Sequence, residues 1–270
     1  MRGIIFEFNR RGQMKFVELI TSGKKDIWNN YLSFNDIFDE VGAPYPPLEH
    51  LQFIEKNGGE KIAALSDDET VILGWIGIIP KANSGYAELA GIEVHKEHRN
   101  EKIATRLIEC AQKWLSDRGV FEFRFSTSPL FTSNTLLYMN KFNSSYTWNN
   151  TASVPPDNIL WPVVDCVMNW KKEPEYNFSP SAAELHKLSI LRWTDLKPSV
   201  DTAMLETQNE DKIIELPFLS LSVIFEQYRL KNYSVTETPF HVFENLNKRG
   251  YQFRSFQKEN EKYYYLLSAK

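Results

Sequence analysis

The most regular pattern in the chain is a helix signal that follows a strand signal after a short loop. Residues 87–94 (AELAGIEV) predict a strand, and from Ile103 apolar residues recur at helical spacing. This apolar stripe consists of Ile103, Leu107, Ala111 and Leu115, flanked by Ala104, Ile108 and Trp114. Gly119 predicts the end of the helix, because glycine readily adopts the left-handed conformation that closes helices. The helix therefore has one face to bury against a sheet.

Strand and helix signals alternate through the first 170 residues. We expect strands at 15–20, 61–65, 71–79, 87–94, 121–125 and 163–170, and helices at 24–40, 48–55, from 103 onward, and at 134–142. This order of elements predicts an α/β fold, in which helices pack against a sheet.

A polar segment with two prolines, residues 171–181 (KKEPEYNFSPS), is the best candidate for a linker. Beyond it we expect strands at 189–193, 212–216, 250–256 and 262–267, and helices at 219–231 and 239–248. The sequence thus predicts two domains, 14–172 and 173–270. The first begins where Met14 opens a natural first strand.

Charge and cysteine usage narrow the partners and the compartment. The formal net charge of −4 argues against nucleic acid or an anionic membrane as the main partner, because both favour a basic face. The apolar run 71–79 (VILGWIGII) is too short to cross a bilayer as a helix. Cys110 and Cys166 lie far apart without metal-ligand spacing, which indicates reduced, buried thiols. We expect a cytoplasmic protein.

The loop between residue 94 and the helix at Ile103 carries the candidate chemistry. The first amides of a helix lack partners within the helix, and they lie at the positive end of its dipole. This arrangement suits a pyrophosphate. Arg99 and Lys102 add positive charge beside it.

At this loop the sequence resembles the GNAT superfamily of N-acyltransferases. The family signature is [QR]-x-x-G-x-[GA], and here Arg99-Asn100-Glu101-Lys102-Ile103-Ala104 follows the strand. The resemblance implies acetyl-CoA or a related acyl-CoA as co-substrate, with loop amides on the pyrophosphate and strand backbone on the pantetheine arm. The implied binding residues are Ile92, Val94, Arg99, Asn100, Glu101, Lys102, Ile103, Ala104 and Thr105. Lys102 departs from the family pattern, which has glycine at this position. Glycine lets the backbone approach the phosphates because it has no side chain.

The whole chain also resembles a group of GNAT-like proteins of similar length that carry a C-terminal extension. The shared segments are TSPLFTSNTLLYMNKF (127–142), DCVMNW (165–170), IIELP (213–217), QYR (227–229) and YYYLL (263–267). This resemblance implies a mixed, mostly antiparallel twisted sheet flanked by helices, with a smaller α/β C-terminal part. It also implies a small-molecule primary amine as acceptor, with amino acids among the candidates. A homodimer is a further candidate partner arrangement.

Proton transfer to and from the reacting groups needs a base and an acid. Glu88 lies eleven residues before Arg99, a spacing that resembles the base of histone-type GNAT enzymes; the competing interpretation is a surface salt bridge. Tyr138, in LLYMNKFN, resembles the family's acid, although it could equally lie in the core. Asn134 resembles the asparagine that contacts the CoA arm, and it is also a candidate N-cap.

Several alternatives stay open at this point. Glu93 and His95 share one strand face and are further candidates for the base, while His95 and His98 lack a third ligand, so we expect no metal. The aromatic residues at 146–148 and 263–265 either line an acceptor pocket or belong to the core. The rival function is a non-catalytic acyl-CoA sensor or partner-binding protein. A third interpretation has an acyl-carrier protein or an aminoacyl-tRNA as the donor. The acidic net charge of the chain argues against both, because both partners are anionic.

Overall fold

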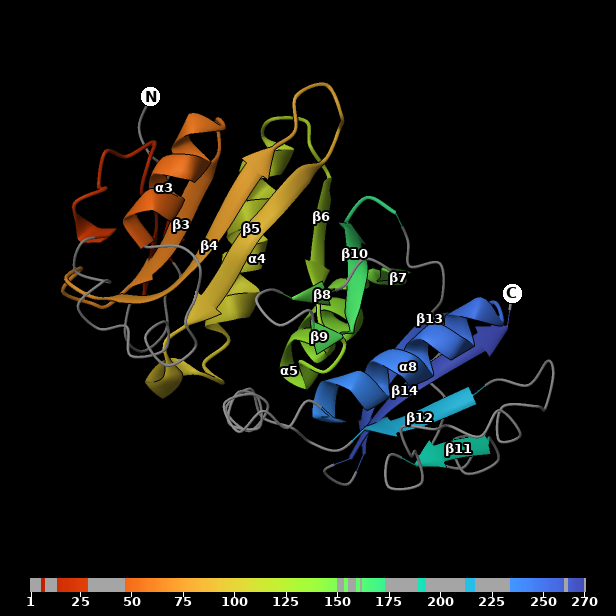
Figure 1. Cartoon of the computed structure of the whole chain (residues 1–270). Helices are drawn as coiled ribbons and strands as arrows, with labels where there is room; N and C mark the ends of the chain where they lie inside the picture. The colour runs from red at the N-terminus through yellow and green to blue at the C-terminus, as the bar shows by residue number, and fades with distance from the viewer. Residues whose placement is uncertain are drawn as a thin grey trace. The chain divides into compact units, whose positions relative to one another are not determined.

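The computed structural model describes two compact units, Met1–Arg124 and Phe125–Lys270 (Figure 1). The described residues are 6–7, 14–28, 47–149, 153–154, 159–160, 162–172, 189–192, 212–216, 234–259 and 262–269. The division between the units falls at Arg124, whereas most of the expected linker at 171–181 lies outside the described residues. A domain division at residue 172 therefore stays a prediction.

The first unit is built on a sheet whose neighbouring strands are antiparallel until its last pair. Its strands are β1 (Phe6–Glu7), β2 (Lys15–Glu18), β3 (Glu60–Leu65), β4 (Ile72–Pro80), β5 (Ala87–Val94) and the start of β6 (Glu122–Thr127), in that spatial order. β5 and β6 pair in parallel at Ala87 and Glu88. β3 is buried along its whole length, and β4 in all but its last residue, because helices cover both faces.

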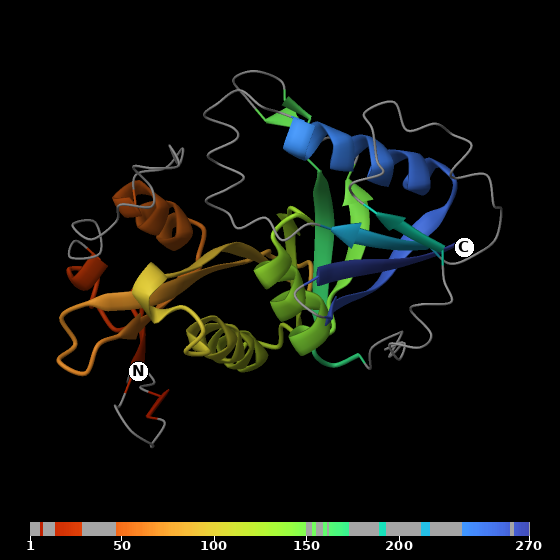
Figure 2. The same ribbon diagram turned by 90° about the horizontal axis from the view of Figure 1, so that it is seen from below.

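Those helices are α3 (Pro47–Lys56) and α4 (Ile103–Ser116), which lie on opposite faces of the sheet (Figure 2). The predicted apolar stripe of α4 is confirmed, since Ile103, Leu107 and Leu115 are at most 1 % exposed. Gly119 takes φ +77° just after the helix, where Val120 N donates to Leu115 O. Glycine thus closes the helix end as predicted.

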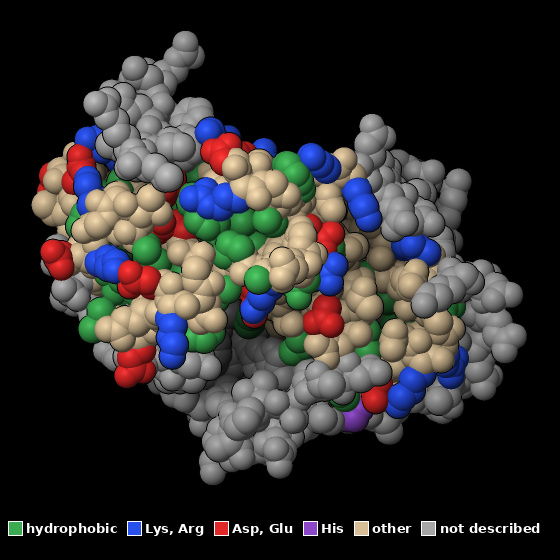
Figure 3. Space-filling view, turned by 90° about the horizontal axis from the view of Figure 1, so that it is seen from above, with side chains coloured by type: hydrophobic (Ala, Val, Ile, Leu, Met, Phe, Trp, Pro, Cys, Tyr) green, Lys and Arg blue, Asp and Glu red, His purple; other side chains and the backbone are tan. Residues whose placement is uncertain are grey.

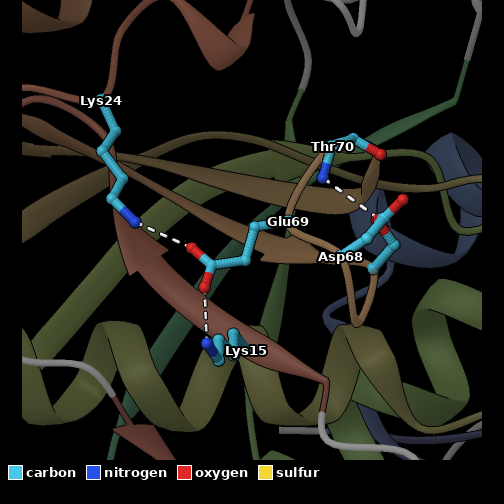
Figure 4. Close-up of polar contacts among 6 residues, drawn as sticks. Lys15, Lys24, Asp68, Glu69 and Thr70 are labelled. Atoms are coloured by element: carbon cyan, nitrogen blue, oxygen red, sulfur yellow. Dashed lines mark hydrogen bonds and ion pairs between the residues drawn. The ribbon is translucent and has the colours of Figure 1, made fainter.

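A charged turn joins β3 to β4 and ties the sheet to the segment before α3. The Glu69 carboxylate lies between Lys15 and Lys24, and Asp68 accepts a hydrogen bond from the Thr70 amide (Figure 4). The hydrogen bonds from the two lysines hold the pKa of Glu69 at about 2. The predicted helix at 24–40 begins in this region, but residues 29–46 lie outside the described part.

The second unit continues the sheet order with the end of β6, then β10 (Val163–Asn169) and β7 (Ser145–Asn149). Between β6 and β7 lie α5 (Thr132–Thr135) and a π-helical turn, η2 (Leu136–Lys141), in the place of the predicted helix at 134–142. The short strands β8 (Ser153–Val154) and β9 (Ile159–Leu160) form a separate hairpin. β7 was not expected from the sequence.

A second, four-stranded sheet completes this unit. Its order is β11 (Ser189–Arg192), β12 (Lys212–Leu216), β14 (Lys262–Ala269) and β13 (Tyr251–Glu259), accompanied by α8 (Ser234–Lys248). The helix predicted at 239–248 starts at Ser234, and the helix predicted at 219–231 lies outside the described residues. The smaller α/β C-terminal part and the mostly antiparallel main sheet are thus confirmed.

Aromatic side chains form the core of the second unit. Trp148 packs against Phe240, and Tyr146 against Phe253. The aromatic clusters at 146–148 and 263–265 therefore contribute Tyr146, Trp148, Tyr263 and Tyr265 to the core. Both cysteines are free and buried, as predicted. No described helix is long and apolar enough to cross a membrane.

Candidate functional site

The turn that enters α4 has an unusual backbone at two positions. Asn100 takes φ +71° and Lys102 takes φ +63°, ψ +18°, both in the left-handed region. Lys102, in the place of the family's glycine, thus adopts the conformation in which glycine is least strained. Its side chain is exposed and makes no capping hydrogen bond. The lysine therefore points to solvent and leaves the backbone of the turn uncovered by its own side chain.

Three amides at the start of α4 face the same turn. The first bond of the helix runs from Arg106 N to Lys102 O, so the amides of Ile103, Ala104 and Thr105 precede the hydrogen-bonded ladder. The first turn of α4 holds no acidic residue. Such donors and the positive end of the helix dipole together suit an anion.

The charged residues of the turn are arranged around the end of β5. Arg99 Nε donates to Val94 O at 3.4 Å, which holds the exposed guanidinium beside the strand end. His98 Nδ1 lies 3.3 Å from Glu101 Oε2. The Glu101 carboxylate is thus engaged by the short helix η1 (Lys96–His98).

Among the described residues, β5 pairs with β4 to its last residue and with β6 only at its beginning. Along β4 the register runs to the last residue, with Ile92 opposite Ile76 and Val94 opposite Gly74. On the other edge, the described ladder with β6 covers Ala87 and Glu88. The backbone from Leu89 to Val94 can therefore pair with an extended ligand. The start of α4 packs against β4 opposite the end of β5. A Cβ on Gly74, which pairs with Val94, would lie 3.1 Å from Ile103 Cγ2.

A comparison with known protein families finds a match that includes β5, the turn at 99–102 and α4. Residues 27–131 match the family model described as acetyltransferase (GNAT) family. The chain contains a GNAT-family domain. The match spans β3, β4 and β5, the turn at 99–102 and all of α4. The GNAT resemblance expected from the sequence is thus confirmed.

Solved GNAT structures match parts of this chain at low sequence identity. A ribosomal-protein-S5-alanine acetyltransferase from Vibrio fischeri is 12 % identical, covering 66 % of this chain and 100 % of its own, with a TM-score of 0.47. An aminoglycoside 6′-N-acetyltransferase complexed with coenzyme A is 15 % identical, covering 64 % and 99 %, with a TM-score of 0.44. A GNAT acetyltransferase from Staphylococcus aureus Mu50 is 21 % identical, covering 62 % and 98 %, with a TM-score of 0.40. The comparison with curated proteins finds no significant match.

The candidate bases of the GNAT domain lie in different surroundings. Glu88 is exposed on β5 and forms an ion pair with Lys81. Glu93 is half-buried, and its Oε2 accepts a hydrogen bond from Trp75 Nε1 at 3.2 Å. The amide of His95 donates to Leu73 O, and within the described residues its buried Nδ1 has no hydrogen-bond partner. Glu88 thus has water access, and Glu93 has a fixed position.

Asn134 and Tyr138 belong to the second unit. The N-cap of α5 is Phe131, so the interpretation of Asn134 as an N-cap is wrong: the helix begins two residues earlier, at Thr132. Tyr138 is 3 % exposed, and its ring makes an edge contact with Phe125 at 4.8 Å. Burial, and to a smaller extent Cys166, raises the pKa of Tyr138 far above its usual range. The phenol therefore stays protonated at neutral pH.

The surface charge and the possible metal ligands of the described residues complete the description of the site. On the face shown in Figure 3, acidic and basic side chains are interspersed rather than gathered by sign. Across the part of the chain that the structure describes, no group of three or more His, Cys, Asp or Glu side chains could hold a metal ion.

A buried polar cluster on the α3 face of the sheet was not predicted from the sequence. Lys61, His50 and Glu93 meet there beside Trp28 and Trp75. A signal was present in the strand KIAAL, where Lys61 shares the strand parity of apolar Ala63. A lysine at an inward-facing position of a strand indicates a buried amine.

Proposed function

We propose that this chain is a CoA-dependent N-acyltransferase that moves an acyl group, acetyl in the simplest case, to the primary amine of a small molecule such as an amino acid. The observation that supports this most is the turn at 99–102 leading into α4. Its two left-handed residues and its unpaired first-turn amides form an anion site beside the open edge of β5. The family match at 27–131 covers this region.

The donor would contact two parts of the first unit. A diphosphate fits the amides of residues 103–105, with Arg99 supplying a positive charge and Lys102 another from solvent. The pantetheine arm fits the open edge of β5, where Ile92 and Val94 offer backbone groups for strand-like pairing. Asn100, Glu101 and Asn134 remain proposed donor contacts. An acyl-CoA supplies the activated thioester carbonyl.

Proton transfer is proposed for Glu88 and Tyr138. The acceptor enters as an ammonium, so Glu88, directly or through water, takes a proton before the amine nitrogen attacks the carbonyl carbon. Attack forms the C–N bond and leaves a second proton on the nitrogen. The C–S bond then breaks, and the departing thiolate takes a proton from Tyr138. The nitrogen releases its second proton as the amide forms, and this proton restores the phenol, directly or through water. Burial keeps the Tyr138 phenol protonated, which is the form that this step needs. Glu93 is the alternative base.

Isothermal titration with CoA tests the donor site. We expect the wild-type chain to bind CoA, and Thr105→Glu to bind it about tenfold more weakly, because the new carboxylate competes for the anion site at the helix start. The control is Asn83→Asp, which adds the same charge in the exposed turn between β4 and β5. Absence of wild-type binding at millimolar CoA would refute the proposal.

A second candidate function, an acyl-CoA sensor without catalysis, draws support from Glu88. Its ion pair with Lys81 is typical of a surface contact. CoA binding without turnover on a broad panel of primary amines would favour the sensor. We also propose a cytoplasmic location, because the two buried free thiols suit a reducing compartment.

A further inference from the structure

The buried cluster on the α3 face centres on a lysine that water does not reach. Lys61, on β3, has an exposed fraction of 0 %. Its Nζ lies 3.5 Å from the ring centroid of Trp28 and 4.1 Å from that of Trp75. It also lies 3.1 Å from His50 Nδ1. Two indole faces and one imidazole nitrogen therefore surround the amine.

Such a lysine costs stability, so its presence points to a role beyond packing. Burial lowers the pKa of Lys61 to about 6, while the carboxylate of Glu93 raises it. Glu60, the neighbouring carboxylate, accepts hydrogen bonds from the amides of Ile20 and Thr21. Among the described residues, the titratable groups that act on the amine are thus His50 on α3 and Glu93 on β5. A methionine could fill the same space without this cost, and strongly perturbed groups concentrate at functional sites.

The cluster contacts β5 at three nearby residues. His50 makes a second hydrogen bond, to the backbone of Ala90; since Nδ1 faces Lys61, Nε2 donates it to the carbonyl. The Trp75 ring fills the space above Gly91, where a Cβ would lie 2.9 Å from its Cη2. Trp75 Nε1 donates to Glu93. These contacts cover the stretch of β5 that precedes the turn at 99–102.

This stretch holds the irregular part of the strand. The register of β4 and β5 shifts between Ile76 and Ile78, so Ala90 and Gly91 together face Gly77. Gly91 takes φ +121°, which a residue with a side chain rarely adopts. A bulge re-aims the backbone groups that follow it. The direction of the backbone from Ala90 to Val94 thus depends on how this bulge is held.

We propose that Lys61 is a positioning residue for the donor edge of β5. It orients His50 and the Trp75 ring, and through them it fixes the bulge at Ala90 and Gly91. The inference rests on the proposed function, because it assigns the open edge of β5 to the pantetheine arm. Lys61 itself touches no substrate; it sets the backbone groups that do.

The test combines stability with CoA affinity. We expect Lys61→Met to keep or raise the melting temperature and to weaken CoA binding about tenfold, because a small displacement of binding groups is costly. The matched control is Lys25→Met, which removes an exposed lysine paired with Glu55 and leaves CoA affinity unchanged. A lysine with a merely structural role would give the opposite pattern, a lower melting temperature with unchanged CoA affinity.

A second pair of variants keeps the test decisive if Lys61→Met does not fold. His50→Gln retains a donor and an acceptor, so it should preserve CoA affinity, whereas His50→Leu should weaken it. Equal CoA affinity for wild type, Lys61→Met and His50→Leu would overturn the inference while leaving the proposed function intact. Failure of the wild-type chain to bind CoA would instead refute the proposed function.

Discussion

Replacement of Lys61 by methionine should stabilise the protein at neutral pH, and by an amount that shrinks as the pH rises. The folded pKa of Lys61 is about 6, against an ordinary value of 10.5. Between these values the unfolded chain binds one proton more than the folded chain. The free energy of unfolding of the wild type therefore rises with pH over this window. The methionine variant lacks this dependence.

The magnitude follows from the pKa difference. One pKa unit corresponds to about 1.4 kcal/mol, so holding the amine neutral at pH 7 costs the fold about 5 kcal/mol. The two indole contacts favour the ammonium form and so raise the folded pKa, but the cost at pH 7 does not change while that pKa stays below 7. Loss of the partner of His50 Nδ1 costs the variant about 1–3 kcal/mol. We therefore expect Lys61→Met to be more stable by about 2–4 kcal/mol at pH 7.

Urea unfolding of both proteins between pH 6 and 9 measures this difference. From pH 7 to pH 9 the advantage of the variant should fall by about 3 kcal/mol, because the wild type alone gains stability. Lys25→Met serves as the control, with a difference from wild type that does not change with pH in this way. A Lys61→Met variant that is less stable than wild type by the same amount at every pH would show that the folded protein holds an ammonium ion. That result would refute the reasoning.

Three further predictions test other parts of the molecule. Lys102→Gly should raise the free energy of unfolding by about 1 kcal/mol, because glycine is not strained in the left-handed conformation of this residue. The same variant should preserve or tighten CoA binding in calorimetry. A large loss of CoA affinity would mean that the lysine contacts a phosphate directly. Glu88→Gln should lower turnover of an amine acceptor with little change in CoA affinity, and unchanged turnover would move the base to Glu93 or to water. Tyr265→Phe should lower the free energy of unfolding by about 1–3 kcal/mol, because its hydroxyl bonds Thr135 Oγ1 at 2.9 Å and a carbonyl at 2.7 Å in the buried core; an unchanged denaturation midpoint would contradict these bonds.

Much of the fold follows from local periodicity. The apolar stripe that starts at Ile103 predicts α4 because one helix face has to be buried, and its buried residues match that stripe. The strands at 61–65, 71–79 and 87–94 were predicted within one residue of β3, β4 and β5. These elements contain long runs in which spacing and burial agree.

Other elements depend on tertiary contacts that no local pattern carries. β7 is five residues long, and its alternating burial comes from pairing with β10 and from the aromatic side chains that pack on Trp148. The π-helical turn at 136–141 differs from an α-helix by a single hydrogen-bond step, which sequence periodicity does not separate. Pairing and helix type are therefore set by packing.

The candidate site shows the same division between local and long-range information. The start of α4 could be predicted because consecutive residues build it, and the anion site proposed there stays a prediction. The Lys61 cluster could not, because its members come from β3, α3, β4, β5 and the segment before α3. Its one local sign is a lysine in an inward strand position, and the cost of that lysine is the reason to expect that it acts on the neighbouring β5. A site assembled from five separate segments becomes visible only once the sheet register brings them together.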